Sequence, residues 1–304
     1  MQGIGVKSLQ RFLDEHANPP WLVLDFTGMQ LYDTCNRKYQ YIREMKLPER
    51  KSVPMLYSSM IIHPILARWY TENGQFAPSE AIWRRMWTSY IKAVNEPNVI
   101  LGNSNIYSRI MAQNIFKQYI GQFALDIDTY KITAIETVYW KELPGVERTI
   151  FASKPDLVLT RLGDNALITA DFKHSVWDSG EDIIPFDRQF LGQSWAAGSA
   201  YMMKNFILVT RDGRIGISRT FKPAATDGDL IVEWLAETVA TAQHVIESRE
   251  REMWRKNAPK ACNDFNRKCE FFDLCELGQL RHKVIENLPK VDPLKYLMVD
   301  STED

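Results

Sequence analysis

The chain has 304 residues, of which 45% are hydrophobic and 25% are charged, so it can bury a large core. The net charge of -1 argues against nonspecific coating of duplex DNA, so any nucleic acid must be held by local basic patches. The first sixteen residues contain no apolar run of signal-peptide length, and no later segment is long enough to span a membrane. We therefore expect a cytoplasmic protein with no membrane partner.

The first part of the chain predicts helices. Cys35 lies among aromatic and basic residues in the first of them, and Ile62, Leu66 and Trp69 form an apolar stripe with helical spacing in the second. Four helices are expected, over residues 29–47, 58–70, 79–94 and 104–129.

Short β-rich runs follow, separated by turn residues. Three strands are expected over 131–140, 148–161 and 166–173, then a helix over 187–204, a hairpin over 205–221 and a long helix over 227–256. Asp212 and Gly213 mark the hairpin turn. This order predicts an α/β fold with a mixed sheet and a helical region inserted before it. The acidic end of the chain is expected to be mobile.

Two acids and a lysine stand out in the strand region. Asp156 stands before the apolar run of one predicted strand, at its mouth, and Asp171 and Lys173 end the next, although Asp is disfavoured within strands. Both carboxylates and the carbonyl of Phe172 offer the oxygen ligands that Mg²⁺ prefers. Lys173 shares a face with Asp171 and can orient or help deprotonate a metal-bound water, or stabilise charge on a phosphate. The alternative is an ion pair at the strand ends.

This stretch resembles the core of the PD-(D/E)XK nuclease superfamily. Pro155-Asp156 and Asp171-Phe172-Lys173 match its two half-motifs, with 14 residues between the acids. The resemblance implies a restriction-endonuclease-like mixed central sheet flanked by helices, with Asp156, Asp171 and Lys173 as catalytic residues. It also implies that the two acids and the Phe172 carbonyl bind Mg²⁺ or Mn²⁺.

Further positions resemble the RecB-like branch of this superfamily. Its upstream metal-binding histidine corresponds to His63 in Ser59-x-x-x-His63, followed by Pro64, which removes a helix hydrogen bond. Glu136 matches the acid of its first core strand. Gln189 matches the first residue of its Gln-x-x-x-Tyr helix, with Gln at position 193 in place of Tyr.

The four cysteines suggest a metal or cluster site. Six residues separate Cys262 from Cys269 and five separate Cys269 from Cys275, so these three can wrap one centre and Cys35 can complete it. Tetrahedral thiolates suit either zinc or an iron–sulfur cluster, and buried free thiols are the alternative. The arrangement is similar to that of AddB and the CRISPR-associated Cas-four nucleases. That resemblance implies a 4Fe–4S cluster, with zinc as the other occupant.

The resemblance also implies a domain order. A helical region (1–130) carries Cys35 and His63, the nuclease core follows (131–225), a long helix and cysteine module (226–285) closes onto the N-terminal helix, and a tail ends the chain (286–304). The basic side chains beside the cysteines are candidate phosphate contacts: Arg37, Lys38, Arg43, Arg267 and Lys268. The nearby Tyr39, Tyr41, Phe271 and Phe272 could stack on unpaired bases, but most of these aromatic rings are expected to pack in the core.

The implied activity is that of a Mg²⁺- or Mn²⁺-dependent deoxyribonuclease, an exonuclease acting on single-stranded DNA ends or overhangs. The chain has no nucleotide-binding helicase motif, so a helicase, recombinase or integrase partner would prepare the substrate. Repair, recombination and spacer acquisition are all compatible settings, in a cell or a virus. Two alternatives remain: a catalytically weak DNA-binding subunit with a nuclease fold, and a zinc-stapled endonuclease.

Overall fold

The computed structural model describes residues 9–100, 106–175, 187–210, 212–224, 228–256, 260–264 and 267–298. The chain divides into two compact units. The first unit comprises Met1–Arg50, Val138–Ser153 and Val232–Asp300, and the second comprises Lys51–Thr137, Lys154–Ile231 and Ser301–Asp304. No helix within the described ranges is both long and apolar enough to cross a membrane.

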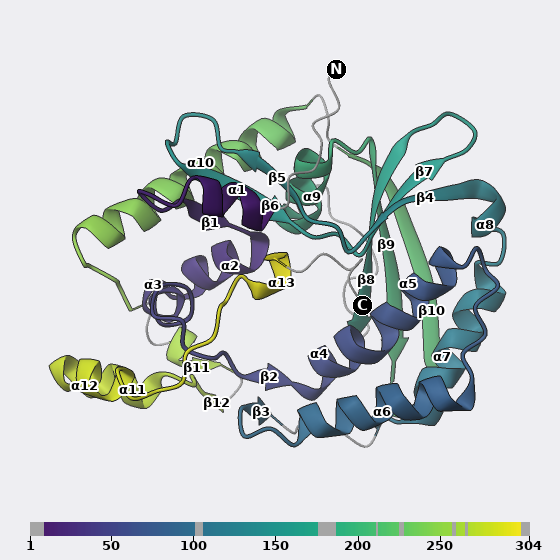
Figure 1. Ribbon diagram of the computed structural model, residues 1–304, viewed down its shortest axis with the longest axis horizontal. Helices are drawn as coiled ribbons and strands as arrows, with labels where there is room; N and C mark the ends of the chain where they lie inside the picture. The colour runs from purple at the N-terminus through teal and green to yellow at the C-terminus, as the bar shows by residue number, and fades with distance from the viewer. Residues whose placement is uncertain are drawn as a thin grey trace. The chain divides into compact units, whose positions relative to one another are not determined.

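A five-stranded mixed sheet forms the second unit, as expected. The strand order is β10-β9-β8-β7-β4, and only β8 and β9 are parallel. Its strands are β4 (Tyr130–Ile135), β7 (Leu157–Arg161), β8 (Leu167–Ser175), β9 (Tyr201–Val209) and β10 (Ile215–Pro223). Helix α9 (Arg188–Ala197) lies in the crossover that a parallel pair requires (Figure 1).

Helices cover one face of this sheet (Figure 1). They are α4 (Val53–Tyr57), η2 (Ser58–Ile62), α5 (His63–Thr71), α6 (Glu80–Val94), α7 (Arg109–Gln122) and the short α8 (Asp126–Thr129). The strands β2 (Lys51–Ser52) and β3 (Val99–Ile100) form a separate parallel pair in this unit. Ile168, Ala170 and Phe172 of β8 point into this helical core, whereas Thr169 and Asp171 bond to α9. The period of two along β8 thus separates a packing face from a polar face.

A three-stranded sheet and helices form the first unit. Its strands, in the order β1-β6-β5, are β1 (Leu22–Leu24), β6 (Thr149–Ser153) and β5 (Tyr139–Glu142). Helix α1 (Leu9–Glu15) precedes β1, and α2 (Phe26–Thr34), α3 (Asn36–Tyr39) and η1 (Gln40–Glu44) follow it. After them come α10 (Asp229–Glu250), η4 (Lys260–Cys262), β11 (Asn263–Asp264), β12 (Arg267–Lys268), α11 (Phe272–Glu276), η5 (Gly278–Leu280), α12 (Arg281–Ile285) and α13 (Lys295–Met298).

Several predicted elements have different boundaries. The predicted strand 131–140 breaks at Glu136, which has a φ of +41°, and β5 pairs in the other unit. The run 148–161 likewise divides into β6 and β7. The predicted helix 187–204 ends at Ala197, because Gly198 adopts the left-handed conformation (φ +69°) that terminates helices. The hairpin is confirmed, with Gly213 at φ +82°.

Two further predictions were wrong for part of their length. The helix over 29–47 is interrupted at Cys35, whose backbone is extended (φ -163°). The tail was expected to be mobile, yet Leu297 is only 2% exposed and packs against Leu9 and Phe12. Long-range burial therefore orders this part of the tail, while 299–304 lie outside the described residues.

Candidate functional site

The register of two strands brings the predicted acids together. In the antiparallel pair of β7 and β8, Leu157 lies opposite Ala170. Asp156, one residue before Leu157, therefore reaches the same level as Asp171, one residue after Ala170. The backbone N–H of Phe172 donates to Asp156 Oδ2 at 2.6 Å. The Phe172 carbonyl faces the same side as its N–H, since both backbone groups of a strand residue point to one neighbour.

His63 reaches this point from the helical face. Its Nδ1 lies 3.1 Å from Asp156 Oδ1 and therefore carries the proton, while its Nε2 lies 2.9 Å from Ser58 Oγ. Ser59, the small residue four positions before His63, does not contact the ring, and its hydroxyl donates to the carbonyl of Met55. The reason is a π-helical turn in η2, in which the His63 N–H bonds five residues back to Ser58.

The same π-helical turn accommodates Pro64. A proline inside a regular helix removes one hydrogen bond and clashes with the preceding turn. Here Pro64 directly follows the π turn in a helix that runs on from η2 into α5, so the regular i→i−4 hydrogen-bond pattern that a proline would break is already interrupted. Single π turns inserted in α-helices occur often at functional sites. The proline is therefore compatible with the position of His63.

Helix α9 holds Asp171 from the polar face of β8. Gln193 Nε2 donates to Asp171 Oδ1 at 3.1 Å, and Gln189 Nε2 donates to Oδ2 at 3.3 Å. Lys173 Nζ forms an ion pair with Asp171 Oδ2 and donates to Gln189 Oε1 at 2.8 Å. Gln189 thus bridges the carboxylate and the ammonium, and both oxygens of the buried Asp171 are bound.

The pKa values of four neighbouring groups depend on one another: those of Asp156, Asp171, His63 and Lys173. Burial raises the pKa of Asp171, Lys173 lowers it and the neighbouring Asp156 raises it again, leaving it above its ordinary value. Burial also opposes ionisation of Asp156, but His63 and the Phe172 N–H outweigh it and lower that pKa. For His63 and Lys173, burial lowers the pKa, and the adjacent carboxylates more than compensate, so both values are raised. The charged forms of both carboxylates therefore depend on nearby cations.

Glu136 is placed beside this group, but its carboxylate is not bound to it. Its backbone N–H donates to the carbonyl oxygen of Asp156 at 3.0 Å. Its carboxylate forms an ion pair with Lys154 at 3.2 Å and is about one-third exposed. Of the predicted site residues, His63 and Asp156 bond to each other, and Asp171, Lys173 and Gln189 form a second bonded group, whereas the Glu136 side chain forms an ion pair outside both.

Ser58 and His174 were not predicted to lie at the site, whereas Gln193 was noted in the sequence as the partner of Gln189. Gln193 lies four residues after Gln189 on one helix face, a signal visible in the sequence. Ser58 had no such signal, because a regular helix places Ser59 beneath His63. Both ring nitrogens of His174 are buried without a hydrogen-bond partner in the described structure, and burial lowers its pKa to about 4. His174 is therefore neutral beside the site.

The donor set fits a divalent cation chemically. Two neighbouring carboxylates, one buried and one partly buried, repel each other, and a cation between them would relieve that repulsion. Within the described residues, no three His, Cys, Asp or Glu side chains are arranged as a metal site. The reason is that Lys173, Gln189, Gln193 and the His63 ring bind the carboxylate oxygens themselves.

The four cysteines gather in the first unit as free thiols. The six residues between Cys262 and Cys269 contain the paired strands β11 and β12, and the Cys269 N–H donates to the Cys262 carbonyl at 3.0 Å. The hairpin therefore brings these two cysteines face to face despite the long gap. Cys275 follows on α11, where its thiol lies 3.8 Å from the Tyr41 hydroxyl.

Cys35 lies in the same neighbourhood. Burial raises the pKa of the Cys262 thiol, and Cys35 and Cys275 raise it further. Burial likewise raises the pKa of Cys269, with Cys275 contributing. Neighbouring thiols hinder each other's ionisation, and the side chains of the described residues are not arranged as a metal site here either.

Most predicted DNA-contacting side chains of this region have other partners. Arg43 is buried in an ion pair with Asp25 at 2.8 Å, so the prediction that it contacts phosphate was wrong. Lys38 pairs with Glu270 at 3.3 Å. The aromatic rings of Tyr39, Tyr41 and Phe271 are buried in the core, so they cannot stack on bases. Lys268 is exposed over the ring of Phe272, and the Arg267 side chain lies outside the described part of the chain.

The chain is similar to several solved structures. A candidate exonuclease from Eubacterium rectale shares 12% identity, covering 89% of this chain and 95% of that one, with a TM-score of 0.48. The alkaline exonuclease of Laribacter hongkongensis shares 14% identity, covering 61% and 91%, with a TM-score of 0.31. A phage-related exonuclease from Haemophilus somnus shares 12% identity, covering 69% and 98%, with a TM-score of 0.30.

Sequence comparison adds nothing to these structural likenesses. No known family model matches the chain, and no curated protein matches it either. The fold is a mixed α/β arrangement whose sheets are flanked by helices, and the neighbours above are exonucleases by name. The function proposed below rests on the residues of the site.

Proposed function

We propose that the chain is a metal-dependent DNA nuclease of the PD-(D/E)XK type. The observation that supports it most is the strand register that sets Asp156 opposite Asp171, with Lys173 and His63 bound to them. An ordinary ion pair at a strand end needs one acid and one base. One buried and one partly buried acid, each held by more than one donor, are better explained by a cation and a phosphate that bind there.

Asp156, Asp171, the Phe172 carbonyl and His63 would hold Mg²⁺ or Mn²⁺. When bound, the metal would polarise a phosphoryl oxygen and lower the pKa of a water molecule. Lys173 keeps its charge, because Asp171 raises its pKa, so it stabilises the negative charge that develops on the phosphate rather than accepting a proton. Gln189 orients both of them through its amide. Glu136 is proposed as an acid at the edge of the site.

The cysteines are proposed to hold a 4Fe–4S cluster, with zinc as the other candidate. Cys262 and Cys269 lie opposite one another across a hairpin. Cys35 and Cys275 raise the pKa of the Cys262 thiol, and Cys275 also raises that of Cys269. Such a centre would join α2 and α3, which meet at Cys35, to the segment after α10 that carries the other three cysteines. The segment after α10 already packs there, since the Arg37 N–H donates to the Arg255 carbonyl and Tyr39 stacks on Trp254. Its role would be structural, because metal binding that joins distant segments contributes to folding free energy.

The substrate proposed is single-stranded DNA at ends or overhangs. The site itself offers no device for unwinding a duplex, so a helicase, recombinase or integrase would supply the strand. Repair, recombination or spacer acquisition would each provide such ends.

Digestion of DNA labelled at one end tests this proposal. Purified protein with Mn²⁺ or Mg²⁺ is expected to shorten a single-stranded oligonucleotide, and chelation of the metal should stop the reaction. The length distribution of the products over time separates stepwise shortening from internal cuts. An unchanged oligonucleotide in both metals, with a folded and metal-loaded protein, would contradict the proposed activity.

Replacing His63 tests its role as a ligand. Imidazole nitrogen favours Mn²⁺ over Mg²⁺, so His63→Ala should lose Mn²⁺-supported cleavage more than Mg²⁺-supported cleavage, by about tenfold. Cleavage rates at several concentrations of each metal measure the difference. Ser59→Ala is the matched control, because that hydroxyl bonds to Met55 and should leave both rates unchanged. Equal rates for His63→Ala and the wild type in both metals would assign His63 a packing role.

A further inference from the structure

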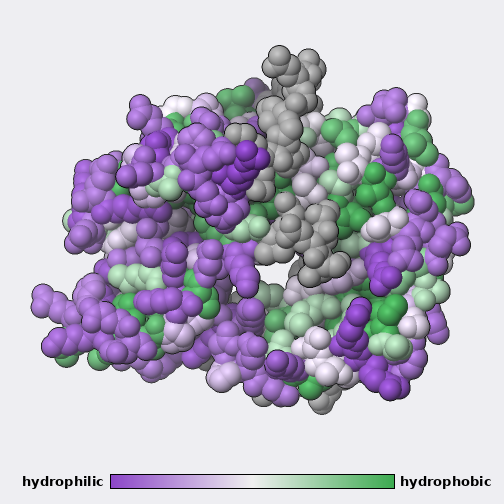
Figure 2. All heavy atoms as spheres, in the orientation of Figure 1, coloured by the Kyte–Doolittle hydropathy of each residue, from purple (hydrophilic) through white to green (hydrophobic). Residues whose placement is uncertain are grey.

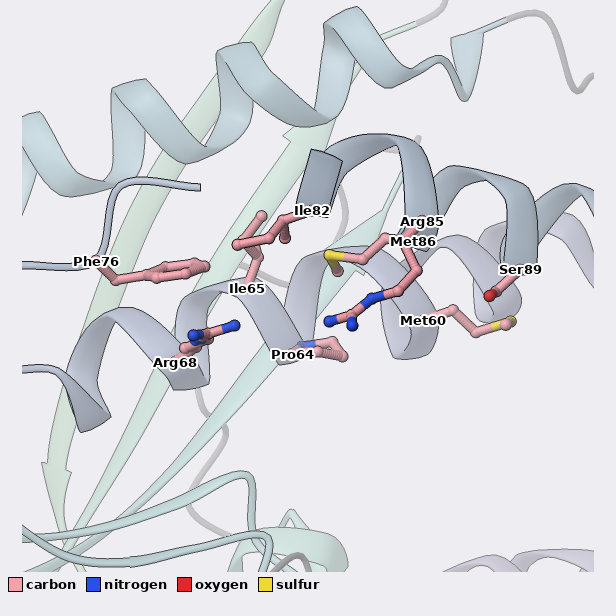
Figure 3. Close-up of a pocket in the computed structure, with 9 residues that line it drawn as sticks. All are labelled: Met60, Pro64, Ile65, Arg68, Phe76, Ile82, Arg85, Met86 and Ser89. Atoms are coloured by element: carbon pink, nitrogen blue, oxygen red, sulfur yellow. The ribbon is translucent and has the colours of Figure 1, made fainter. Parts of the chain in front are cut away.

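A cavity of about 320 Å³ lies on the helical face of the second unit, lined by nine residues of η2, α5, α6 and the loop between α5 and α6. Figure 3 shows its walls, made largely by apolar side chains such as Met60, Ile65 and Met86. Figure 2 shows hydrophobic residues set among strongly hydrophilic ones over this part of the surface. The volume is at the small end of the range for ligand pockets, which suits one nucleotide-sized group.

Two arginines give this cavity its charge. Figure 3 shows the guanidinium groups of Arg68 and Arg85 directed toward one another at its mouth. The nine lining residues contain no acid. Glu72 binds Arg68 Nε at 2.7 Å, and the guanidinium lies 4.6 Å from the centre of the Phe76 ring, so Arg68 is held in place. The Arg85 side chain has no hydrogen bond or ion pair with any residue in the described ranges. Two guanidinium groups directed toward one another favour an anion that both can contact, such as phosphate.

The cavity adjoins the proposed metal site through one helix. Met60, Pro64 and Arg68 are spaced by four residues and form one helix face, whereas His63, the residue before Pro64, points toward Asp156. A helix with its side chains is about 10–12 Å across. A strand whose phosphate lies at Asp156 and Asp171 can therefore reach the cavity with a neighbouring nucleotide.

We propose that this cavity is a nucleotide subsite for single-stranded DNA, in which the base contacts the methionine and isoleucine side chains while Arg68 and Arg85 bind its phosphate. This rests on the nuclease function proposed above and extends it to a place where the strand is gripped. The contacts to the base are apolar, and Ser89 is the one uncharged polar side chain among the lining residues, so binding tolerates any base.

Arg85→Gln and Arg84→Gln form a matched pair for the test. Both arginines are exposed on α6 and both changes remove one positive charge, but only Arg85 lines the cavity. With a fluorescent single-stranded oligonucleotide, Arg85→Gln should raise the Kd and the KM about tenfold and leave kcat unchanged. Arg84→Gln should change each value less than about twofold. Circular dichroism and melting temperature verify that both variants fold.

A scan of abasic sites locates the subsite. Oligonucleotides that lack one base at successive positions from the cleaved end should bind the wild type about tenfold more weakly at one position only. In Arg85→Gln the same scan should be nearly flat, because the neighbouring phosphate is no longer held.

The outcomes separate the two proposals. A folded wild type that cleaves no DNA contradicts the nuclease function. Cleavage with equal KM values in the two arginine variants, or an abasic scan without a preferred position, contradicts only the subsite. An acidic peptide with apolar residues that binds the wild type and not Arg85→Gln, while DNA affinity is the same in both, would assign the cavity to a protein partner and overturn the subsite.

Discussion

Lys173→Ala is expected to reduce DNA cleavage by about 10² or more, because it removes the one ammonium bound to Asp171 at the proposed reaction centre. Asp171→Asn should have a comparable effect, since it removes a carboxylate from the proposed metal ligands while keeping the size of the side chain. Initial rates on single-stranded DNA in saturating Mn²⁺ measure both losses. DNA binding should persist in Lys173→Ala, because the cavity lined by Arg68 and Arg85 is unchanged.

A matched lysine serves as the control. Lys131 is exposed on β4, away from the described hydrogen bonds of Asp156 and Asp171, so Lys131→Ala should cleave at the wild-type rate. Melting temperatures of all variants exclude loss of folding as the cause. A pure, folded Lys173→Ala protein with the wild-type rate would show that the Asp-Phe-Lys segment is a structural ion pair, and the proposed chemistry would be wrong.

Cys35→Ala and Cys275→Ala are expected to destabilise the protein by similar amounts. If both thiolates hold one centre, either change opens it and releases the connection between distant parts of the chain. A cross-link that closes a loop of about 100 residues contributes roughly 5 kcal/mol, so each variant should lose about 4 kcal/mol or more of unfolding free energy. Iron content, zinc content and visible absorption, measured after anaerobic purification, follow the centre directly. An iron–sulfur cluster is coloured, whereas zinc is not.

The two models for Cys35 differ in magnitude. As an ordinary buried thiol, Cys35 would leave only a small cavity when replaced by Ala, at a cost of about 1 kcal/mol. Ile150→Val, a conservative change in the core of the same unit, should reduce the free energy of unfolding by about 1 kcal/mol and serves as the reference for such a small cavity. Full metal occupancy in Cys35→Ala, together with a loss no larger than that of Ile150→Val, would contradict the four-cysteine centre.

Local patterning in the sequence predicts the central strands and the polar face of β8 well. The alternation around Asp171 and Lys173 places both side chains on one face, because the period of a strand is two whatever surrounds it. The hairpin at Gly213 follows from turn residues between two apolar runs. The proximity of Asp156 and Asp171 needs only that two consecutive strands form an antiparallel pair, the commonest arrangement for neighbours in sequence.

Other features depend on partners that are distant in the chain. The apolar run before and after Glu136 reads as one strand, yet its halves pair in different sheets, since periodicity reports burial and not the neighbouring strand. Arg43 reads as a surface cation, but Asp25 draws it into a buried ion pair. Cys262 and Cys269 face one another only because β11 and β12 fold back between them.

The position of His63 shows the division most clearly. The sequence by itself determined that a histidine follows small residues on an apolar helix, and that two acids and a lysine flank neighbouring strands. Only the tertiary structure decided that a π-helical turn places Ser58 beneath the ring, tolerates Pro64 and directs Nδ1 to Asp156. A π turn is intrinsically unfavourable and is formed where distant contacts compensate for it. Here the carboxylate of Asp156, directly before β7, supplies such a contact, and it lies more than ninety residues along the chain.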